Sequence, residues 1–412
     1  MAIDNKDKKI LNVPPLRFPE FSGEWKCTTI GNIGDIKNGP FGSVLHAEDY
    51  VENGIPIVTT EHFKTGLMPS DKFGIPQVSN EDYIRLKGYR LETNDIVFSR
   101  VGSVDINAHV GIEQNGWLFS GRVLRVRPKY DIDSLFLHYA LSTEAVKRDI
   151  RNRAVGQTMP SINTPILSST TIQLPKDLFE QKKVAHFLRL LDERIITQNK
   201  IIEDLKKLKS AISKHLFARK DLLETTICLS NIATLKNGYA FQSGKYNALG
   251  KWKILTITNV SGERYINDED YNCIINLPND IQDHQVLKEG DILISLTGNV
   301  GRVSLCKDGD YLLNQRVGLL QLAKNVNQEF LYQILSSQRF ENSMIACGQG
   351  AAQMNIGKGD VESYVLPYSS NVNNILLVAK ILHSYDEYII NEQRKLTLLT
   401  MQKQYFLAQM FI

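Results

Sequence analysis

The stretch DIVFSRVGSV at residues 95–104 returns in the second half of the chain as DILISLTGNV at residues 291–300. Five of the ten positions are identical, and most of the others exchange one aliphatic or small residue for another. Each copy is an apolar, partly β-branched run closed by a glycine, which is typical of a strand followed by a turn. The chain therefore carries the same local structure twice.

Other stretches match in the same order in the two halves. They are IGNIGDIKNGPFGS (30–43) with LSNIATLKNGYAFQS (229–243), IPIVTTEHF (55–63) with WKILTITNV (252–260), GRVLRVRP (121–128) with QRVGLLQL (315–322), GQTMPSIN (156–163) with GQGAAQMN (348–355), and TIQLP (171–175) with SYVLP (363–367). The offset between the copies drifts only from 199 to 192 residues. Chance similarities would not keep this order, so the sequence indicates a two-fold internal duplication.

Each copy has two parts. The first part predicts strands and turns, with one helix near residues 134–151 and its counterpart near residues 328–346. The second part predicts a long helix. In the first copy this helix begins at KDLFEQ (176–181), where Asp177 can cap it and Glu180 stands three residues on, as in a capping box.

Both long helices carry apolar residues at the 3.5-residue spacing of a coiled coil. These residues are Val184, Leu188, Leu191, Ile195, Ile202, Leu205, Ile212 and Leu216 in the first helix, and Val378, Leu382, Tyr385, Ile389, Leu396, Leu399, Phe406 and Met410 in the second. Polar residues interrupt the two stripes at equivalent places, by Gln198 and Lys209 in one and by Glu392 and Lys403 in the other. Such residues commonly set the register of a coiled coil.

An antiparallel pairing of the two helices predicts two cross-helix ion pairs, Lys403 with Asp192 and Lys209 with Asp386. It also predicts that the chain near Phe411 returns close to residues 24–29. A parallel coiled coil, with both α/β parts at the same end, is the less favoured alternative.

The expected fold class is α+β: two similar mixed α/β domains separated by two long helices that form an antiparallel coiled coil with pseudo-two-fold symmetry. The predicted divisions are an N-terminal segment (1–24), a first α/β domain (25–175), a first helix (176–218), a second α/β domain (219–367) and a second helix (368–412).

Composition favours a reduced, cytoplasmic globular protein. The chain of 412 residues is 42% hydrophobic and 23% charged, and it contains no apolar run long enough to span a membrane. Its five cysteines are scattered without a CxxC pair, which argues against a disulfide framework and a zinc cluster. The net charge is only +3, but residues 147–220 hold 16 Lys or Arg against 7 Asp or Glu. Such a region suits phosphate contact, although a solvated helix face explains it equally well.

The chemistry of an enzyme is absent from the sequence. There is no Asn/Asp-Pro-Pro-aromatic stretch, no Gly-rich cofactor loop after a strand and no GxxxxGK[ST] motif. The histidines show no HxxxH or HExxH pattern, and the two ExK stretches in residues 19–26 and 176–183 are poor metal sites. We therefore expect no metal site and no catalysis by this chain. Two similar but diverged domains on one chain suit a double helix with two different half-sites.

The chain resembles the specificity (S) subunits of type I restriction–modification systems over nearly all of its length. The resemblance lies in PPLRFPEFSGEWK (14–26), in the paired stretches given above, and in DLFEQKKVAHFLRLLDERI (177–195) with VAKILHSYDEYII (378–390). It implies two target-recognition domains, each of which reads one half of an asymmetric, bipartite site in double-stranded DNA. The helices would space the halves and dock two methyltransferase (M) subunits, and motor-nuclease (R) subunits would join them. S-adenosylmethionine, Mg²⁺ and ATP are expected only in those partner subunits.

The duplication sorts the candidate DNA-binding residues. Residues shared by both copies are candidates for phosphate contact or for fold, and polar residues that differ in matched loops are candidates for base readout. The shared candidates are Lys37, Asn38, Lys236, Asn237, Arg122, Arg316, Gln157 and Gln349. For the Asn-Gly pairs a plain turn is the simpler explanation, and for the two arginines a buried ion pair is equally good. The amides of Gln157 and Gln349 would suit adenine.

The differing candidates are Thr60, Glu61 and His62 against Thr258 and Asn259, Arg100 against Thr297, Ser103 against Asn299, and Thr158 in the Gly-Gln loop, with Arg302 and Gln353 as further second-copy candidates. Arg151 and Arg153, together with Arg148, are expected to supply non-specific attraction to phosphate.

Two other functions compete with this one. A methyltransferase or nuclease fragment with its own activity would show turnover with S-adenosylmethionine and Mg²⁺. A scaffold that never reads bases would show salt-sensitive binding to DNA without sequence preference, and the paired, diverged loops argue against it.

Overall fold

A computed structural model describes residues 12–40, 47–348 and 354–412. Its contacts divide the chain into two units, residues 1–197 with 396–412 (unit 1) and residues 198–395 (unit 2). Each unit therefore contains one α/β head and one stretch of each long helix. Among the described residues, no helix is long and apolar enough to cross a membrane.

The two heads share most of one order of elements, and among the described residues the first head has three more than the second. The first head contains β1 (Lys26–Thr29), α1 (Ile30–Ile33), β2 (Gly34–Asn38), β3 (Tyr50–Val51), β4 (Ile55–Val58), β5 (Gln77–Val78), α2 (Asn80–Arg85), β6 (Ile96–Ser99), β7 (Asn107–His109), β8 (Leu118–Phe119), β9 (Val123–Pro128), α3 (Ser134–Leu141), α4 (Glu144–Arg153), α5 (Thr164–Ser168) and β10 (Thr171–Leu174). The second contains β11 (Thr225–Cys228), β12 (Ala233–Asn237), β13 (Trp252–Leu255), β14 (Asn272–Ile274), β15 (Ile292–Ser295), β16 (Val303–Leu305), β17 (Tyr311–Leu313), β18 (Val317–Leu322), α7 (Gln328–Leu335), α8 (Gln338–Gly348), α9 (Lys358–Glu362) and β19 (Val365–Tyr368).

The duplication seen in the sequence is a duplication of sheet topology. A four-stranded antiparallel sheet has the order β2-β9-β6-β7 in the first head and β12-β18-β15-β16 in the second. A smaller sheet contains one parallel pair in each head, β4 with β8 and β13 with β17. A two-stranded ladder joins the start of each head to its end, β1 with β10 and β11 with β19.

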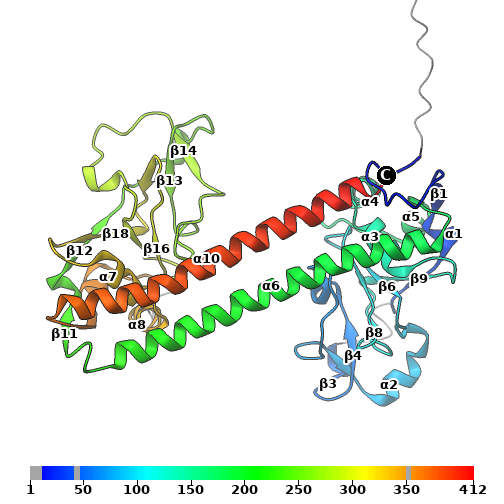
Figure 1. The fold of residues 1–412 in the computed structure, drawn as a ribbon, viewed down its shortest axis with the longest axis horizontal. Coiled ribbons are helices and arrows are strands. Elements are labelled where there is room, and N and C mark those ends of the chain that lie inside the picture. The colour runs from blue at the N-terminus through cyan, green and yellow to red at the C-terminus, as the bar shows by residue number, and fades with distance from the viewer. Residues whose placement is uncertain (1–11, 41–46, 349–353) are drawn as a thin grey trace, which may run out of the picture. The chain divides into compact units, whose positions relative to one another are not determined.

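Successive residues of a strand point to opposite faces of its sheet. In each head, residues on both faces of the four-stranded sheet are buried. In unit 1, Ile96 and Phe98 of β6 pack with α3 and the adjoining long helix, whereas Val97 packs with β4 and β8. In unit 2, Ile292 and Ile294 of β15 face the helices and Leu293 faces the smaller sheet. Figure 1 shows this layering in each unit: β4 in one and β13 in the other lie on the side of the sheet away from the long helices.

The single helix predicted after the last strand of each sheet is in fact two helices, α3 and α4 in the first head and α7 and α8 in the second. Hydroxyl side chains at the break compete for the carbonyl groups that would continue the helix. Thr143 Oγ1 donates to the carbonyl of Ala140 at 2.8 Å, and Ser337 Oγ donates to that of Ile334 at 2.5 Å.

The long helices are α6 (Leu178–Ala218) and α10 (Val372–Gln409). Asp177 caps α6, since its Oδ1 accepts from the N–H of Phe179 at 2.8 Å. The predicted capping box is wrong, because Glu180 turns to the N-terminal segment instead. Its buried carboxylate accepts from Arg17 Nε at 2.7 Å and from Trp25 Nε1 at 3.2 Å.

The two helices pair antiparallel within each unit, and both expected ion pairs are present. In unit 1, Lys403 Nζ lies 2.5 Å from Asp192 Oδ1, and in unit 2, Lys209 Nζ lies 2.6 Å from Asp386 Oδ1. The other polar interruption of the stripes is also paired, since Gln198 Nε2 donates to the carbonyl of Glu392 at 3.0 Å.

The chain near its end packs on its beginning in unit 1, as the antiparallel register predicts. The ring of Phe411 lies 6.1 Å from that of Trp25 and 5.1 Å from that of Phe136, measured between centroids. The N–H of Leu16 donates to the carbonyl of Gln409 at 2.8 Å. The stretch 396–412 thus completes the core of the first head.

Candidate nucleic-acid interface

Three backbone hydrogen bonds join the candidate readout segments of the first head. The N–H of Arg100 donates to the carbonyl of Arg122 at 3.0 Å, that of Gly102 to Pro160 at 2.8 Å, and that of Ile162 to Arg100 at 2.9 Å. The segment after β6, the segment before β9 and the Gly-Gln loop therefore lie side by side. Arg100, Ser103, Arg122, Gln157 and Thr158, which are far apart in the sequence, are gathered on these three segments.

The second head repeats this arrangement bond for bond. The N–H of Leu296 donates to the carbonyl of Arg316 at 3.0 Å, that of Gly298 to Met354 at 3.0 Å, and that of Ile356 to Leu296 at 2.9 Å. The scaffold is shared by the two heads, whereas the side chains it presents differ. This is the arrangement expected of two readers with different half-sites.

These bonds also correct the sequence match between the two Gly-Gln loops. Pro160 in the first head occupies the place of Met354 in the second, an offset of 194 residues rather than 192 (354 − 160 against 348 − 156). In the sequence, the second loop thus has two more residues than the first between its Gly-Gln pair and the residue that accepts this hydrogen bond. Two short, loose matches could not reveal an insertion within the loop itself. Gln349 and Gln353 lie outside the described residues.

Arg122 and Arg316 stand at equivalent places directly before β9 and β18. Both side chains are exposed, so the alternative of a buried ion pair does not hold for either. Neither guanidinium makes a hydrogen bond or ion pair with the described residues. Each guanidinium is therefore open to solvent.

The Lys-Asn-Gly stretches end β2 and β12 and do not form hairpin turns. A Cβ atom on Gly39 would lie 1.9 Å from the carbonyl oxygen of Ser120, so only glycine permits this close approach. Lys37 is half-buried, with its Nζ 5.1 Å from the ring centroid of Tyr89, and Asn38 Oδ1 is buried without a hydrogen-bond partner among the described residues.

In the second head the equivalent glycine is Gly238, whose Cβ would lie 2.1 Å from the carbonyl oxygen of Asn314. Lys236 is half-buried and Asn237 is exposed. The carbonyl of Asn237 accepts from His284 Nε2 at 3.1 Å, so the backbone there belongs to the fold while the amide side chain faces solvent.

The candidates at residues 60–62 form a short 3-10 helix, Thr60–Phe63. His62 Nδ1 accepts the N–H of Thr59 at 3.0 Å, and burial lowers the pKa of this imidazole. Glu61 is exposed and forms an ion pair with Lys64. His62 is therefore neutral and structural, and Thr60 and Glu61 remain at the surface.

The matching candidate Asn259 needs correction. Its side chain is only 2% exposed, and its Nδ2 donates to the carbonyls of Asn267 and Asp270, both at 2.8 Å. Its Oδ1 accepts the N–H of Thr256 at 2.7 Å. The amide is fully used in folding the loop and has no group left for a base, while its neighbour Thr258 is exposed.

The loop tips after β6 and β15 present different side chains in the two heads. Ser103 and Asn299 are exposed on equivalent turns. Thr297 is half-buried, with an Oγ1 that has no hydrogen-bond partner among the described residues. Arg302 lies 3.5 Å from Glu341 Oε1 through its Nε and donates from Nη1 to the carbonyl of Ser261 at 3.4 Å, so it is partly engaged within the head.

The three arginines expected to attract phosphate, Arg148, Arg151 and Arg153, differ in their surroundings, and Arg148 is exposed. Arg153 donates to Asp149, to Thr170, to the carbonyl of Ile166 at 3.0 Å and to Ser169 at 2.9 Å, and so it closes the end of α5. This side chain is structural, which corrects the expectation. Arg151 bridges Asp105 and Glu144 and is 42% exposed. It lies at the rim of the interface with its charge already paired.

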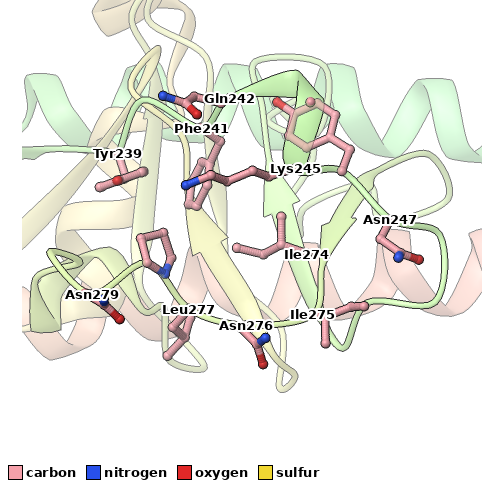
Figure 2. A pocket seen from close by; sticks show the side chains of 13 residues that line it. Tyr239, Phe241, Gln242, Lys245, Asn247, Ile274, Ile275, Asn276, Leu277 and Asn279 are labelled. Atoms are coloured by element: carbon pink, nitrogen blue, oxygen red, sulfur yellow. The ribbon is translucent and has the colours of Figure 1, made fainter.

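An open pocket of about 460 Å³ lies in the second head beside the Lys-Asn-Gly stretch. Figure 2 shows Tyr239, Phe241 and Lys245 on one side and Ile274 and Leu277 on the other. The backbone carbonyl of Tyr239 accepts the N–H of Gln315 at 3.0 Å, one residue from Arg316. This pocket could not be predicted from sequence, because its apolar lining residues resemble ordinary core residues.

The described residues contain no cluster of three His, Cys, Asp or Glu side chains able to hold a metal ion. The gathered groups are instead arginines, amides and hydroxyls on exposed loops. These side chains bind by hydrogen bonds and charge, and they are the types that contact DNA phosphates and base edges.

The known protein family that matches this chain is the type I restriction modification DNA specificity domain, whose model covers residues 22–207 and again residues 224–401. The chain belongs to this family. The internal duplication is thus a pair of type I DNA specificity domains, and each match includes one head and most of the helix that follows it.

Relatives of this specificity-domain chain agree in length as well as in sequence. The specificity subunit of the type I restriction enzyme MjaVIII from Methanocaldococcus jannaschii is 27% identical over 364 residues, which is 82% of this chain and 80% of that protein. The crystal structure of the type I S subunit from M. genitalium has a TM-score of 0.59 at 17% identity and covers 97% of this chain and 99% of its own. A chain from a structural study of type I complex assembly has a TM-score of 0.56 at 14% identity, with 94% and 97% covered. At these identities the two structures support the fold.

Proposed function

We propose that this chain is the DNA-specificity subunit of a type I restriction–modification complex. Each head reads one half of an asymmetric, bipartite site in double-stranded DNA, and the long helices space the halves. The observation that carries this proposal is the pair Arg122 and Arg316. Both are exposed and unpaired among the described residues, and both stand beside loops that share a backbone scaffold but differ in side chains.

Contacts divide into two classes under this proposal. Arg122, Arg316, Lys37 and Lys236 contact phosphate and set the position of each head on the duplex, because they occur at the same place in both heads. The tips that carry Ser103 and Asn299, with Arg100 and Gln157, contact base edges, because they differ between the heads or present a free amide.

The exposed sides of the long helices are the proposed docking faces for two methyltransferase subunits. On α10, Leu398, Met401 and Tyr405 are 65%, 59% and 58% exposed at the spacing of one helical face, within unit 1. In unit 2, Tyr388 of α10 is 61% exposed and Leu208 of α6 is 47% exposed. Apolar side chains exposed in this way mark interaction surfaces.

In this proposal the chain is not itself catalytic. S-adenosylmethionine and the adenine-methylating groups belong to the methyltransferase subunits, and ATP and Mg²⁺ belong to motor-nuclease subunits that join when DNA is restricted. The side chains gathered at the interface supply binding and orientation, since they include no paired carboxylates and no activated nucleophile.

The experiment is to co-express the chain with its methyltransferase subunit and to map methylated adenines across genomic DNA. The expected result is a split, asymmetric motif. Replacing the first head by that of a family relative should change one half of the motif and leave the other intact. Methylation without a motif would favour a scaffold, and turnover by the purified chain alone with S-adenosylmethionine would favour an enzyme.

Matched variants separate the two classes of contact. Arg122→Ala should weaken binding to all DNA sequences and lower the slope of log affinity against log salt by about one. Gln157→Ala should instead relax the motif at one position of the first half. If Arg122→Ala also relaxed the motif at one position, the assignment of Arg122 to phosphate would be contradicted.

A further inference from the structure

The Gly-Gln loop of the first head exposes two apolar side chains next to its free amide. Val155 and Met159 are 64% and 66% exposed, and Gln157 and Thr158 between them are exposed as well. A single exposed apolar residue on a surface needs no explanation. Here two of them flank, within five residues, an exposed amide that makes no side-chain hydrogen bond with the described residues, so the loop presents apolar and hydrogen-bonding groups together.

Backbone hydrogen bonds tie the two ends of this loop together and restrict its conformation. Val155 and Ser161 exchange two backbone hydrogen bonds, at 2.9 and 2.8 Å, and Gly102 donates to the carbonyl of Pro160. Gly156 has a φ of +102°, and a Cβ atom there would lie 2.8 Å from the carbonyl oxygen of Met159. A loop fixed in this way presents its side chains with little ordering cost on binding.

The chemistry of the loop matches one kind of base pair. In the major groove an A·T pair presents the N7 and N6 groups of adenine, which an amide side chain binds with two hydrogen bonds, and the methyl group of thymine, which an apolar side chain contacts. A G·C pair presents no methyl group. We propose that Met159 contacts the 5-methyl group of a thymine in the half-site read by the first head, beside an adenine bound by Gln157.

The contact belongs to the first half-site only. With Pro160 matched to Met354 by the backbone bonds, the residue of the second copy that corresponds to Met159 is Gln353 in the sequence. A polar amide makes no favourable apolar contact with a methyl group. The thymine contact is therefore expected in the first half-site and not in the second.

The inference rests on the proposed function, and the test uses the complex of the full chain with its methyltransferase subunit. The probes are duplexes with the motif found by methylation mapping, in which single thymines are replaced by uracil, which lacks only the methyl group. The wild-type complex should lose affinity about four-fold for uracil at one position of the first half, the amount expected for one buried methyl group. Met159→Ala should bind the thymine duplex more weakly and be indifferent to uracil at that position, whereas Met159→Leu should keep the sensitivity.

Phe73→Ala is the matched control, because Phe73 is another exposed apolar residue of the same head, on a different loop, and is 93% exposed. This variant should retain the wild-type response to uracil. Two results would overturn the inference: a Met159→Ala complex as sensitive to uracil as the wild type, or a wild-type complex insensitive to uracil at every position of the first half. If the wild-type complex shows no motif at all, the proposed function has failed instead, and the two failures are thus distinct.

Discussion

Gly238 packs its α-carbon against the neighbouring strand connection, where a Cβ atom would lie 2.1 Å from the carbonyl oxygen of Asn314 and 2.6 Å from that of Leu313. We expect Gly238→Ala to destabilise unit 2 by about 1 to 3 kcal/mol, because backbone on both sides must move. Chemical denaturation of the purified complex measures the change. Gly359→Ala in α9 is the control, since nothing lies within 4 Å of its Cβ position. Equal effects of the two variants would contradict the close approach.

A second prediction at the residue scale concerns acid. His138 is buried in α3 with its Nδ1 2.7 Å from Asn107 Oδ1, and burial lowers its pKa to about 3. The unfolded chain binds a proton near pH 6.5, whereas the folded chain resists it. The free energy of unfolding therefore falls as pH drops from about 6.5 toward 3, by up to about 1.4 kcal/mol per pH unit.

The measurement is the difference in the free energy of unfolding between pH 7 and pH 5 for the wild type and for His138→Gln. The variant should lose less stability over this range. Burial also lowers the pKa of His109, which adds a smaller effect of the same sign. His186→Gln, at an exposed position of α6, should behave as the wild type. A wild-type difference near zero would show that His138 is not held neutral.

Sequence could point to some residues that the structure shows to be exposed, but it could not exclude others that are engaged within the fold, for physical reasons. The duplication picked out Arg122 and Arg316 because both copies keep an arginine before the same strand. It also picked Asn259, and the arginines that precede the first Gly-Gln loop suggested Arg153. The structure shows that both side chains form hydrogen bonds within their heads. Residue type cannot tell an amide that faces solvent from one that closes a loop, since that depends on contacts between distant segments.

At the scale of elements, aspartates beside the helix stripes join each long helix to the other helix and to the adjoining head. Asp386 accepts from Lys209 at 2.6 Å, from Arg264 at 2.9 Å and from Gln333 at 2.6 Å. We expect Asp386→Asn to destabilise unit 2 by roughly 3 to 5 kcal/mol, because it leaves Arg264, which is almost fully buried, with a weakened partner.

Asp192 is the matched comparison in unit 1, where Lys403 and the hydroxyl of Tyr139 bind it. Lys403 is 26% exposed and can turn to water, so Asp192→Asn should cost less, on the order of 1.5 to 3 kcal/mol. Hydrogen exchange in each head separates the two effects. A larger loss for Asp192→Asn would mean that Arg264 finds sufficient compensation in Glu329, which lies 2.6 Å away.

The register of the helices followed from sequence because a heptad stripe with few polar interruptions has few ways to pair. The break between α3 and α4 did not, because Ser142 and Thr143 are ordinary residues in a helix until their hydroxyls take a backbone carbonyl. The insertion in the second Gly-Gln loop was hidden for a similar reason. The hydrogen bonds donated by Gly102 and Gly298 show which loop residues of the first head correspond to which loop residues of the second.

At the scale of the whole molecule, unit 1 is discontinuous in sequence, whereas unit 2 is not. Deleting residues 396–412 removes Phe411 from its contacts with Trp25 and Phe136 and uncovers part of α6. We expect this truncation to unfold or loosen the first head, while the second keeps its protection. Hydrogen exchange read by mass spectrometry checks the prediction head by head. Equal loss of protection in both heads would show that the units do not behave separately.

Antiparallel pairing of the helices also has a consequence for synthesis. The first head leaves the ribosome early, but its core lacks residues 396–412 until the whole of unit 2 has been translated. At about 5 to 20 residues per second, roughly 200 further residues take on the order of 10 to 40 s. During that time the stripe that includes Leu188 and Leu191 is open to other chains in the cell. The head that is translated first is thus completed only after the second head has been made.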